Sequence, residues 1–201
     1  WSNVKLLLNF EDATGSSVYT DRSLFNKPVG IVNRGSGTIQ ISDVNPIIGS
    51  RSSLWSSTDD QGPYLTTTVD DPDLNLAQIS TWTYECWVNT ADTFYTTTNA
   101  GILHWGLIGT TFYRLEVEIL NKDVDGRHGI TFWVQGSSGS GVLFETTSKF
   151  FSGQDTHIAI VRDISNFYIY VNGEQNGPYV YSFDFNNTGR YLSIGVNYQG
   201  G

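Results

Sequence analysis

The chain has 201 residues with 20 acidic and 11 basic side chains, a formal net charge of −9, and a single cysteine. Nucleic-acid binding is not expected, because phosphate contacts need lysine and arginine side chains clustered on one face, and the basic residues here are scattered along the chain. A lone cysteine cannot close an internal disulfide, and no apolar run is long enough for insertion into a membrane.

Short strands separated by turn-forming residues are predicted along the whole chain. The strands are expected at residues 4–10, 29–32, 38–41, 53–56, 64–67, 82–89, 101–107, 112–119, 129–135, 142–145, 156–163, 167–172 and 191–196. No segment keeps a 3.6-residue apolar period over three turns, and residues 73–79 predict one helical turn at most. The pattern predicts an all-β fold, a two-sheet antiparallel β-sandwich or jelly roll, in a single domain over residues 1–201.

The strongest local signal is a hairpin at residues 156–173. Its first strand is rich in β-branched side chains and ends at Arg162 and Asp163. Its second strand mixes aromatic and β-branched residues and ends at Asn172 and Gly173, the dipeptide that most readily takes positive φ at two successive positions. We therefore expect this segment to form an antiparallel pair.

Five segments occur in an informative order. They are residues 6–12 (LLLNFED), 21–23 (DRS), 82–88 (WTYECWV), the 156–173 hairpin and 191–195 (YLSIG). Together they resemble concanavalin A-like, laminin-G-like jelly-roll domains. The resemblance implies a domain that binds glycans or proteins and, in most members, does no chemistry.

One departure from the resemblance concerns the end of the chain. Members of the family usually close with a further strand that the sequence does not show after residue 196. The chain also begins at Trp1 and contains no methionine. We therefore expect a segment of a larger bacterial-surface or phage polypeptide, with other domains or subunits of the parent assembly among its partners.

A catalytic centre is not expected. The resemblance extends to glycosidases that carry E-x-D-x-x-E on one strand, where alternation points three carboxylates into one cleft. The nearest match begins at Glu116, has Glu118 at the third position, and has Asn121 where the general acid would stand. Alternation indicates instead that both glutamates face solvent while their apolar neighbours face the core. A glycoside hydrolase is the weakest alternative.

The histidines and the cysteine form no catalytic or metal-binding pattern. No Gly-x-Ser-x-Gly elbow is present, and the histidine spacing does not indicate a shared metal. His104, beside Trp105, is a candidate surface residue; His128 is expected in a solvated turn and His157 as a strand residue. Cys86, in an alternating strand pattern, is expected to be buried and inert.

Calcium is the metal candidate, because hard cations prefer carboxylate and carbonyl oxygens supplied by loops. The favoured loop is framed by Glu11, Asp12 and Asp21. A second acidic region holds Asp59, Asp60, Asp70, Asp71 and Asp73. The resemblance implies a calcium ion in some members. The alternative interpretation is that these side chains cap turns, which aspartate does well.

Sugar recognition uses exposed aromatic rings that stack on a pyranose, together with polar groups that bind its hydroxyls. The aromatic residues expected to be exposed, at strand ends or in loops, and to bind the ligand are Tyr95, Trp105, Tyr113, Tyr179 and Tyr181. Those expected in the core are Trp87, Phe132 and Phe167. Ordinary packing is the alternative for each ring.

The sequence therefore predicts a non-catalytic recognition module that binds cell-surface carbohydrate. Its expected location is extracellular or on a virion surface, within a longer protein. The alternative is a structural or decoration domain of a phage particle that has no sugar site.

Overall fold

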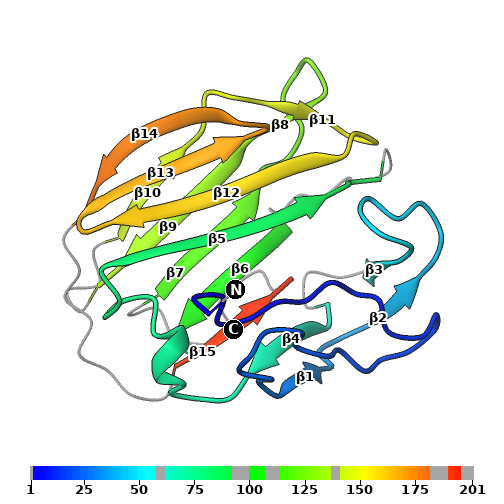
Figure 1. The fold of residues 1–201 in the computed structure, drawn as a ribbon. Coiled ribbons are helices and arrows are strands. Elements are labelled where there is room, and N and C mark those ends of the chain that lie inside the picture. The colour runs from blue at the N-terminus through cyan, green and yellow to red at the C-terminus, as the bar shows by residue number, and fades with distance from the viewer. Residues whose placement is uncertain are drawn as a thin grey trace.

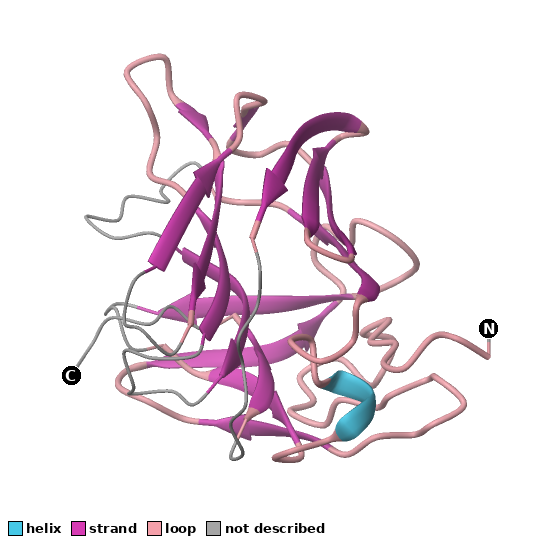
Figure 2. Ribbon diagram, turned by 90° about the vertical axis from the view of Figure 1, so that its left-hand side faces the viewer, coloured by secondary structure: helices cyan, strands magenta, loops and turns pink. Residues whose placement is uncertain are grey.

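Strands dominate the structure, as predicted. The computed structural model describes residues 2–57, 62–91, 100–106, 114–136, 141–181 and 190–195. Figure 2 shows strands and loops in nearly all of the coloured ribbon, with the one helical turn at its edge. Among the described residues, no helix is long and apolar enough to cross a membrane.

Two antiparallel sheets form a sandwich, which confirms the predicted fold class. The larger sheet contains β1 (Val29–Val32), β4 (Tyr64–Thr67), β15 (Tyr191–Ile194), β6 (Ala100–Gly106), β7 (Arg114–Ile119), β9 (Ile130–Gln135) and β10 (Gly141–Glu145), in that spatial order. The smaller sheet contains β14 (Glu174–Val180), β13 (Asn166–Val171), β12 (Thr156–Asp163) and β5 (Thr81–Val88), in that order. In Figure 1 the four-stranded sheet lies across the front of the seven-stranded sheet.

Smaller elements complete the described fold. A hairpin pairs β2 (Gly37–Ser42) with β3 (Ser52–Ser57), and a short pair joins β8 (Arg127–His128) to β11 (Phe150–Phe151). The helical element η1 (Pro72–Leu74) is a single 3₁₀ turn that begins after Asp71, whose side chain accepts the Asp73 N–H.

The main core lies between the two sheets. Alternate residues of the central strands point inward, as the two-residue period of a strand requires. The fully buried side chains include Leu115 and Val117 of β7, Phe132 and Val134 of β9, Ile158 and Ile160 of β12, and Phe167 and Ile169 of β13. Phe132 and Phe167 meet across the sandwich with ring centroids 4.8 Å apart. These contacts fix the two sheets face to face.

A second core lies beneath the β2–β3 hairpin. It is built from Tyr19, Ile39, Ile41 and Leu65, with the Trp55 ring packed against it. The Trp55 ring also covers Gly195, which has a φ of +80°; a Cβ placed there would lie 1.5 Å from the ring. Only glycine therefore allows the hairpin to dock so closely at the end of β15.

Arg162, near the end of the hairpin's first strand, β12, has a structural role. Its guanidinium Nη1 donates to the carbonyl oxygens of Leu76, Ala77 and Ile79 at 2.7–2.8 Å, and its Nε donates to that of Ile164 at 2.8 Å. Burial lowers the pKa of Arg162. One side chain thus satisfies four backbone acceptors and fixes the segment after η1 to the four-stranded sheet.

The predicted strands agree closely with the observed ones, with three exceptions. Residues 4–10 form no strand: Phe10 has a φ of +57°, and the Leu7 N–H donates to the Asp21 carboxylate rather than to a sheet. The paired strands β8 and β11 have two residues each, which is too short to produce an alternating sequence pattern. Strand β14 was not predicted, because its sequence EQNGPYV is polar and contains proline.

Candidate functional site

A row of polar side chains crosses the face of the seven-stranded sheet that points away from the core. The register aligns Ser193 of β15, His104 of β6, Glu116 of β7 and Trp133 of β9 on four adjacent strands. Their neighbours along the strands are core residues: Leu192, Leu103, Trp105, Leu115, Val117, Phe132 and Val134. Alternation therefore places the four side chains, here called the polar row, together on the opposite face.

The polar row is buried although it faces outward from the sandwich. Ser193 and His104 are 0% exposed and Glu116 is 2% exposed, while Trp133 is half-buried. Within the described part of the chain, four of its buried atoms have no hydrogen-bond partner: both ring nitrogens of His104, Oγ of Ser193 and Nε1 of Trp133. Buried polar groups normally have partners, so a concentration of unsatisfied atoms on one face calls for an explanation.

Two arginines surround the row. Arg114 Nη1 lies 3.4 Å from Glu116 Oε2, and its guanidinium carbon lies 5.4 Å from the centroid of the Trp133 ring. Burial, reinforced by the charges of Arg114 and Arg190, lowers the pKa of His104 to about 3. His104 is therefore neutral near pH 7 and presents one ring nitrogen as a donor and the other as an acceptor.

Glycine on the neighbouring edge strand gives the Trp133 ring its position. A Cβ at Gly141 would lie 2.4–2.9 Å from atoms of the indole, so the ring occupies the space that a side chain on β10 would fill. Gln135, next along β9 on the same face, is the cross-strand partner of both Arg114 and Gly141. The row thus combines an indole, a neutral imidazole, a hydroxyl and charged groups within a few strands.

The expected solvent exposure of Glu116 and His104 is wrong. Alternation correctly separated Glu116 from its core neighbours Leu115 and Val117, but it could not show that the outward face of β7 is also buried. Asn121, at the sixth position of the glycosidase-like pattern, lies beyond the end of β7.

The five aromatic residues predicted to bind ligand do not come together among the described residues. Trp105 is 2% exposed and packs in the main core, so its predicted exposure is wrong. The Tyr179 ring stacks on Phe144 at 4.7 Å, and its hydroxyl donates to the Glu145 carbonyl oxygen at 2.9 Å. Tyr181 is half-buried against the same core. The remaining two predicted positions, Tyr95 and Tyr113, lie outside the described residues.

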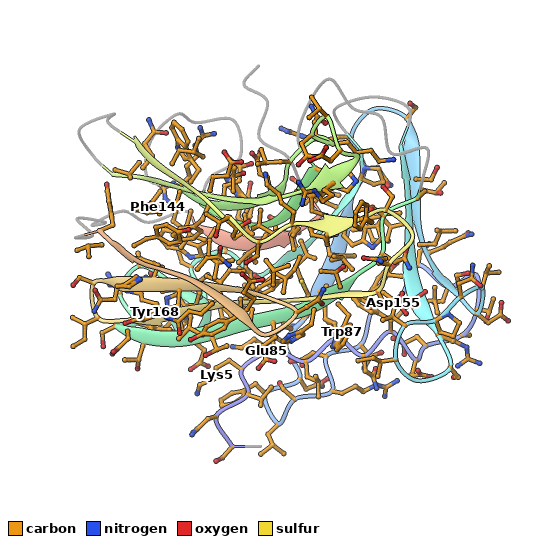
Figure 3. All side chains as sticks on the ribbon, turned by 90° about the horizontal axis from the view of Figure 1, so that it is seen from above. Lys5, Glu85, Trp87, Phe144, Asp155 and Tyr168 are labelled. Atoms are coloured by element: carbon orange, nitrogen blue, oxygen red, sulfur yellow. The ribbon has the colours of Figure 1, made fainter. Side chains whose placement is uncertain are left out.

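The solvent exposure of Trp87 and of His128 also differs from expectation: Trp87 is more exposed than predicted and His128 is less exposed. Trp87 is 46% exposed on the outer face of the four-stranded sheet, where its ring lies 5.1 Å from that of His157. Figure 3 shows Trp87 and Glu85 projecting from this sheet on the side away from the seven-stranded sheet. His128 is fully buried, with its ring nitrogens bonded to Leu120 and Ser152.

The predicted calcium ligands are engaged by protein donors. Asp21 accepts the backbone N–H groups of Leu7, Ser23 and Lys27; burial opposes its ionisation, but these bonds outweigh it and lower the pKa of Asp21. Asp12 binds Thr20 and Arg22. Glu11 binds Ser50 and Arg51. The three carboxylates therefore serve as turn and loop caps, which is the alternative interpretation of this loop.

The second acidic region is paired in a similar way. Lys27 contacts Asp71 at 2.7 Å and Asp73 at 3.2 Å, and Asp70 accepts the Arg190 N–H at 2.9 Å. The other two predicted positions, Asp59 and Asp60, lie outside the described residues. Among the described residues, no group of three or more His, Cys, Asp or Glu side chains could hold a metal. The carboxylates of these loops that the structure describes already have protein partners, and calcium stays a prediction of the sequence.

Several solved structures are similar in fold. Domain 4 of AbnA, an extracellular arabinanase of Geobacillus stearothermophilus solved with arabinotriose, is 19% identical, with a TM-score of 0.60 over 90% of this chain and 79% of that one. The binding domain of botulinum neurotoxin serotype D/C is 15% identical, with a TM-score of 0.68 over 96% of this chain and 43% of that one. The enzymatically active domain of tailspike protein 2 of bacteriophage CBA120 is 15% identical, with a TM-score of 0.53 over 81% of this chain and 26% of that one.

These likenesses concern the fold, because all three identities are low. The chain spans less than half of the toxin domain and about a quarter of the tailspike chain. No curated protein matches the sequence. The family model of the concanavalin A-like lectin/glucanases superfamily matches residues 59–201, and this chain belongs to that superfamily.

Proposed function

We propose that this domain is a non-catalytic carbohydrate-binding module and that its ligand binds along the polar row. The observation that carries the proposal is the set of unsatisfied polar atoms of His104, Ser193 and Trp133 on one face of one sheet. A bound ligand that offers both donors and acceptors would satisfy them.

The chemistry of the row suits a saccharide. Sugar hydroxyls donate and accept, as do neutral His104 and Ser193, while the indole N–H of Trp133 only donates. An indole ring can also cover the apolar C–H face of a pyranose. The half-buried Trp133 and Arg114 lie at the accessible margin of the row, where a ligand can first make contact.

Absence of catalysis is part of the proposal. A glycosidase needs a carboxylic acid positioned to protonate the leaving oxygen. Glu116 is ion-paired with Arg114, and Asn121 stands where the sequence pattern of the related glycosidases places the last carboxylate. Release of reducing sugar from a β-glucan by the wild type, abolished in Glu116→Gln, would overturn this part.

The setting we propose is extracellular or on a virion surface, within a larger assembly. Membership of a lectin and glucanase superfamily supports carbohydrate as the ligand class. The similar folds of an arabinanase domain solved with arabinotriose and of a phage tailspike are consistent with such a setting.

A glycan array with two tryptophan variants tests the proposal. Trp133→Ala removes the indole of the polar row, whereas Trp87→Ala removes an exposed indole from the opposite side of the sandwich. We expect the wild type and Trp87→Ala to bind the same glycans and Trp133→Ala to lose them. Binding lost only in Trp87→Ala would move the site to the outer face of the four-stranded sheet. A folded wild type that binds no glycan would favour a structural domain.

A further inference from the structure

We infer that the saccharide carries a carboxylate group and that Arg114 is the residue that recognises it. This inference rests on the proposed carbohydrate-binding function and names the class of sugar. It requires the centre of the row to favour a negative charge, and it requires a guanidinium within reach of the ligand.

The first requirement follows from the surroundings of His104. Burial is the main cause that lowers the pKa of His104, and the positive charges of Arg114 and Arg190 lower it further. Burial opposes any charge, so the part of the effect that bears on the ligand is the positive potential of the two guanidinium groups. A potential that disfavours an imidazolium favours a carboxylate at the same place. This is notable in a chain whose net charge is −9.

The unsatisfied atoms also favour a ligand with a carboxylate group. The Trp133 N–H, the Ser193 hydroxyl and one nitrogen of neutral His104 are donors that need acceptors. The acceptor positions left over are the second His104 nitrogen and the Ser193 oxygen. A carboxylate supplies two strong acceptor oxygens, and sugar hydroxyls can serve the remaining positions.

The two flanks of the row differ in charge and so predict an orientation. On one flank Arg114 is the cross-strand partner of Gln135. On the other flank Glu118 pairs with Thr131, and Thr131 with Glu145. The carboxylate should therefore lie toward Arg114 and Gln135, with hydroxyls of the sugar donating toward Glu118.

Arg114 has the geometry for the recognition role. Its side chain is 14% exposed, and its guanidinium lies beside both Glu116 and the Trp133 ring. The planar guanidinium offers parallel N–H donors that match a carboxylate, which a lysine ammonium cannot reproduce. We expect Arg114→Lys to lower affinity for a carboxylated glycan about 10- to 100-fold, the usual range for a hydrogen bond to a charged group.

The test compares matched ligands and matched variants. Calorimetry would use oligogalacturonate, its methyl ester, and any acidic glycan that the array identifies together with that glycan's methyl ester. The variants are Arg114→Lys and the double variant Arg114→Gln, Glu116→Gln, which removes both charges of the ion pair and leaves no lone buried charge. The control is the double variant Arg127→Gln, Asp125→Asn, which likewise removes both charges of an ion pair, at the start of β8 and away from the row.

The expected result is a preference of at least tenfold for the acid over its ester, reduced in both Arg114 variants and retained in the double variant Arg127→Gln, Asp125→Asn. If esterification leaves affinity unchanged while Trp133→Ala abolishes it, the carbohydrate-binding proposal stands and the carboxylate inference is wrong. If the folded protein binds no glycan, both proposals fail.

Discussion

The outward faces of the two sheets follow different rules. Along β5 of the four-stranded sheet, exposed and half-buried residues alternate throughout, as expected for a sheet with one face in solvent. Along β6 and β7 of the seven-stranded sheet, residues of both faces are mostly buried, although one face is polar. Polar groups on the outward face of the four-stranded sheet can be hydrated. Buried polar groups on the outward face of the seven-stranded sheet need partners from the protein or from a ligand.

The largest expected difference between the two faces concerns a glutamate on each. Glu116→Gln removes the buried carboxylate 3.4 Å from Arg114 and should destabilise the protein by about 3 kcal/mol, as breaking a buried ion pair does. Glu85→Gln changes an exposed side chain and should cost less than about 0.5 kcal/mol. Urea unfolding of both variants checks this. Equal losses of unfolding free energy would show that the two outward faces do not differ in this respect.

Protonation should also distinguish the faces. Because the pKa of His104 is lowered to about 3, its folded-state ring stays neutral while the ring in the unfolded chain takes up a proton below about pH 6.5. Stability from this group is complete above pH 6.5 and falls as the pH drops toward 3. Between pH 7 and 5 the expected loss is about 2 kcal/mol.

The variant His104→Asn checks this. Unfolding midpoints at pH 7 and 5 should differ less in His104→Asn than in the wild type. An unchanged pH response in His104→Asn would show that other groups dominate.

A smaller effect with opposite signs is expected for two buried serines. Ser193→Ala removes an unsatisfied hydroxyl and should be neutral or stabilise the unliganded protein by up to about 1 kcal/mol. Ser148→Ala should cost about 1 kcal/mol, because its hydroxyl bonds with the buried amide of Asn176. Thermal unfolding of both variants would resolve the sign, and destabilisation by Ser193→Ala would reveal a partner for that hydroxyl.

The smallest expected effect is that of calcium. Since Glu11, Asp12 and Asp21 already bind protein donors, adding calcium to chelator-treated protein should leave the unfolding temperature unchanged. A rise that saturates with calcium concentration would place a cation site where the described residues show none.

Sequence patterns predicted the fold well because its signals are local. Alternation and turn residues located most strands, and the turn after β13 has Asn172 and Gly173 at φ values of +51° and +83°, as the dipeptide indicates. The predicted strand at residues 4–10 is wrong because an apolar run does not reveal which partner takes its N–H groups. Here the Asp21 carboxylate takes one of them.

The site was far less predictable. Alternation assigns a residue to a face, and it correctly set Glu116 apart from its neighbours, but it is silent on whether that face is covered. Trp105 and Trp87 were misassigned for the same reason: the period tells inside from outside only when the register of the sheet is known. Ser193 follows Glu116 by 77 residues in the sequence, yet the two lie in the same row across the sheet. Their alignment depends on the order of the strands, which no local sequence pattern encodes.

The position of Trp133 over Gly141 gives the protein an internal optical probe. Its indole N–H is shielded and without a partner, and its ring lies beside a guanidinium, so its emission should respond when a hydrogen-bond acceptor arrives. Of the tryptophans that the structure describes, it is the one aligned with His104 and Glu116. Occupancy of the face could therefore be followed by intrinsic fluorescence, without labelling either the protein or the sugar.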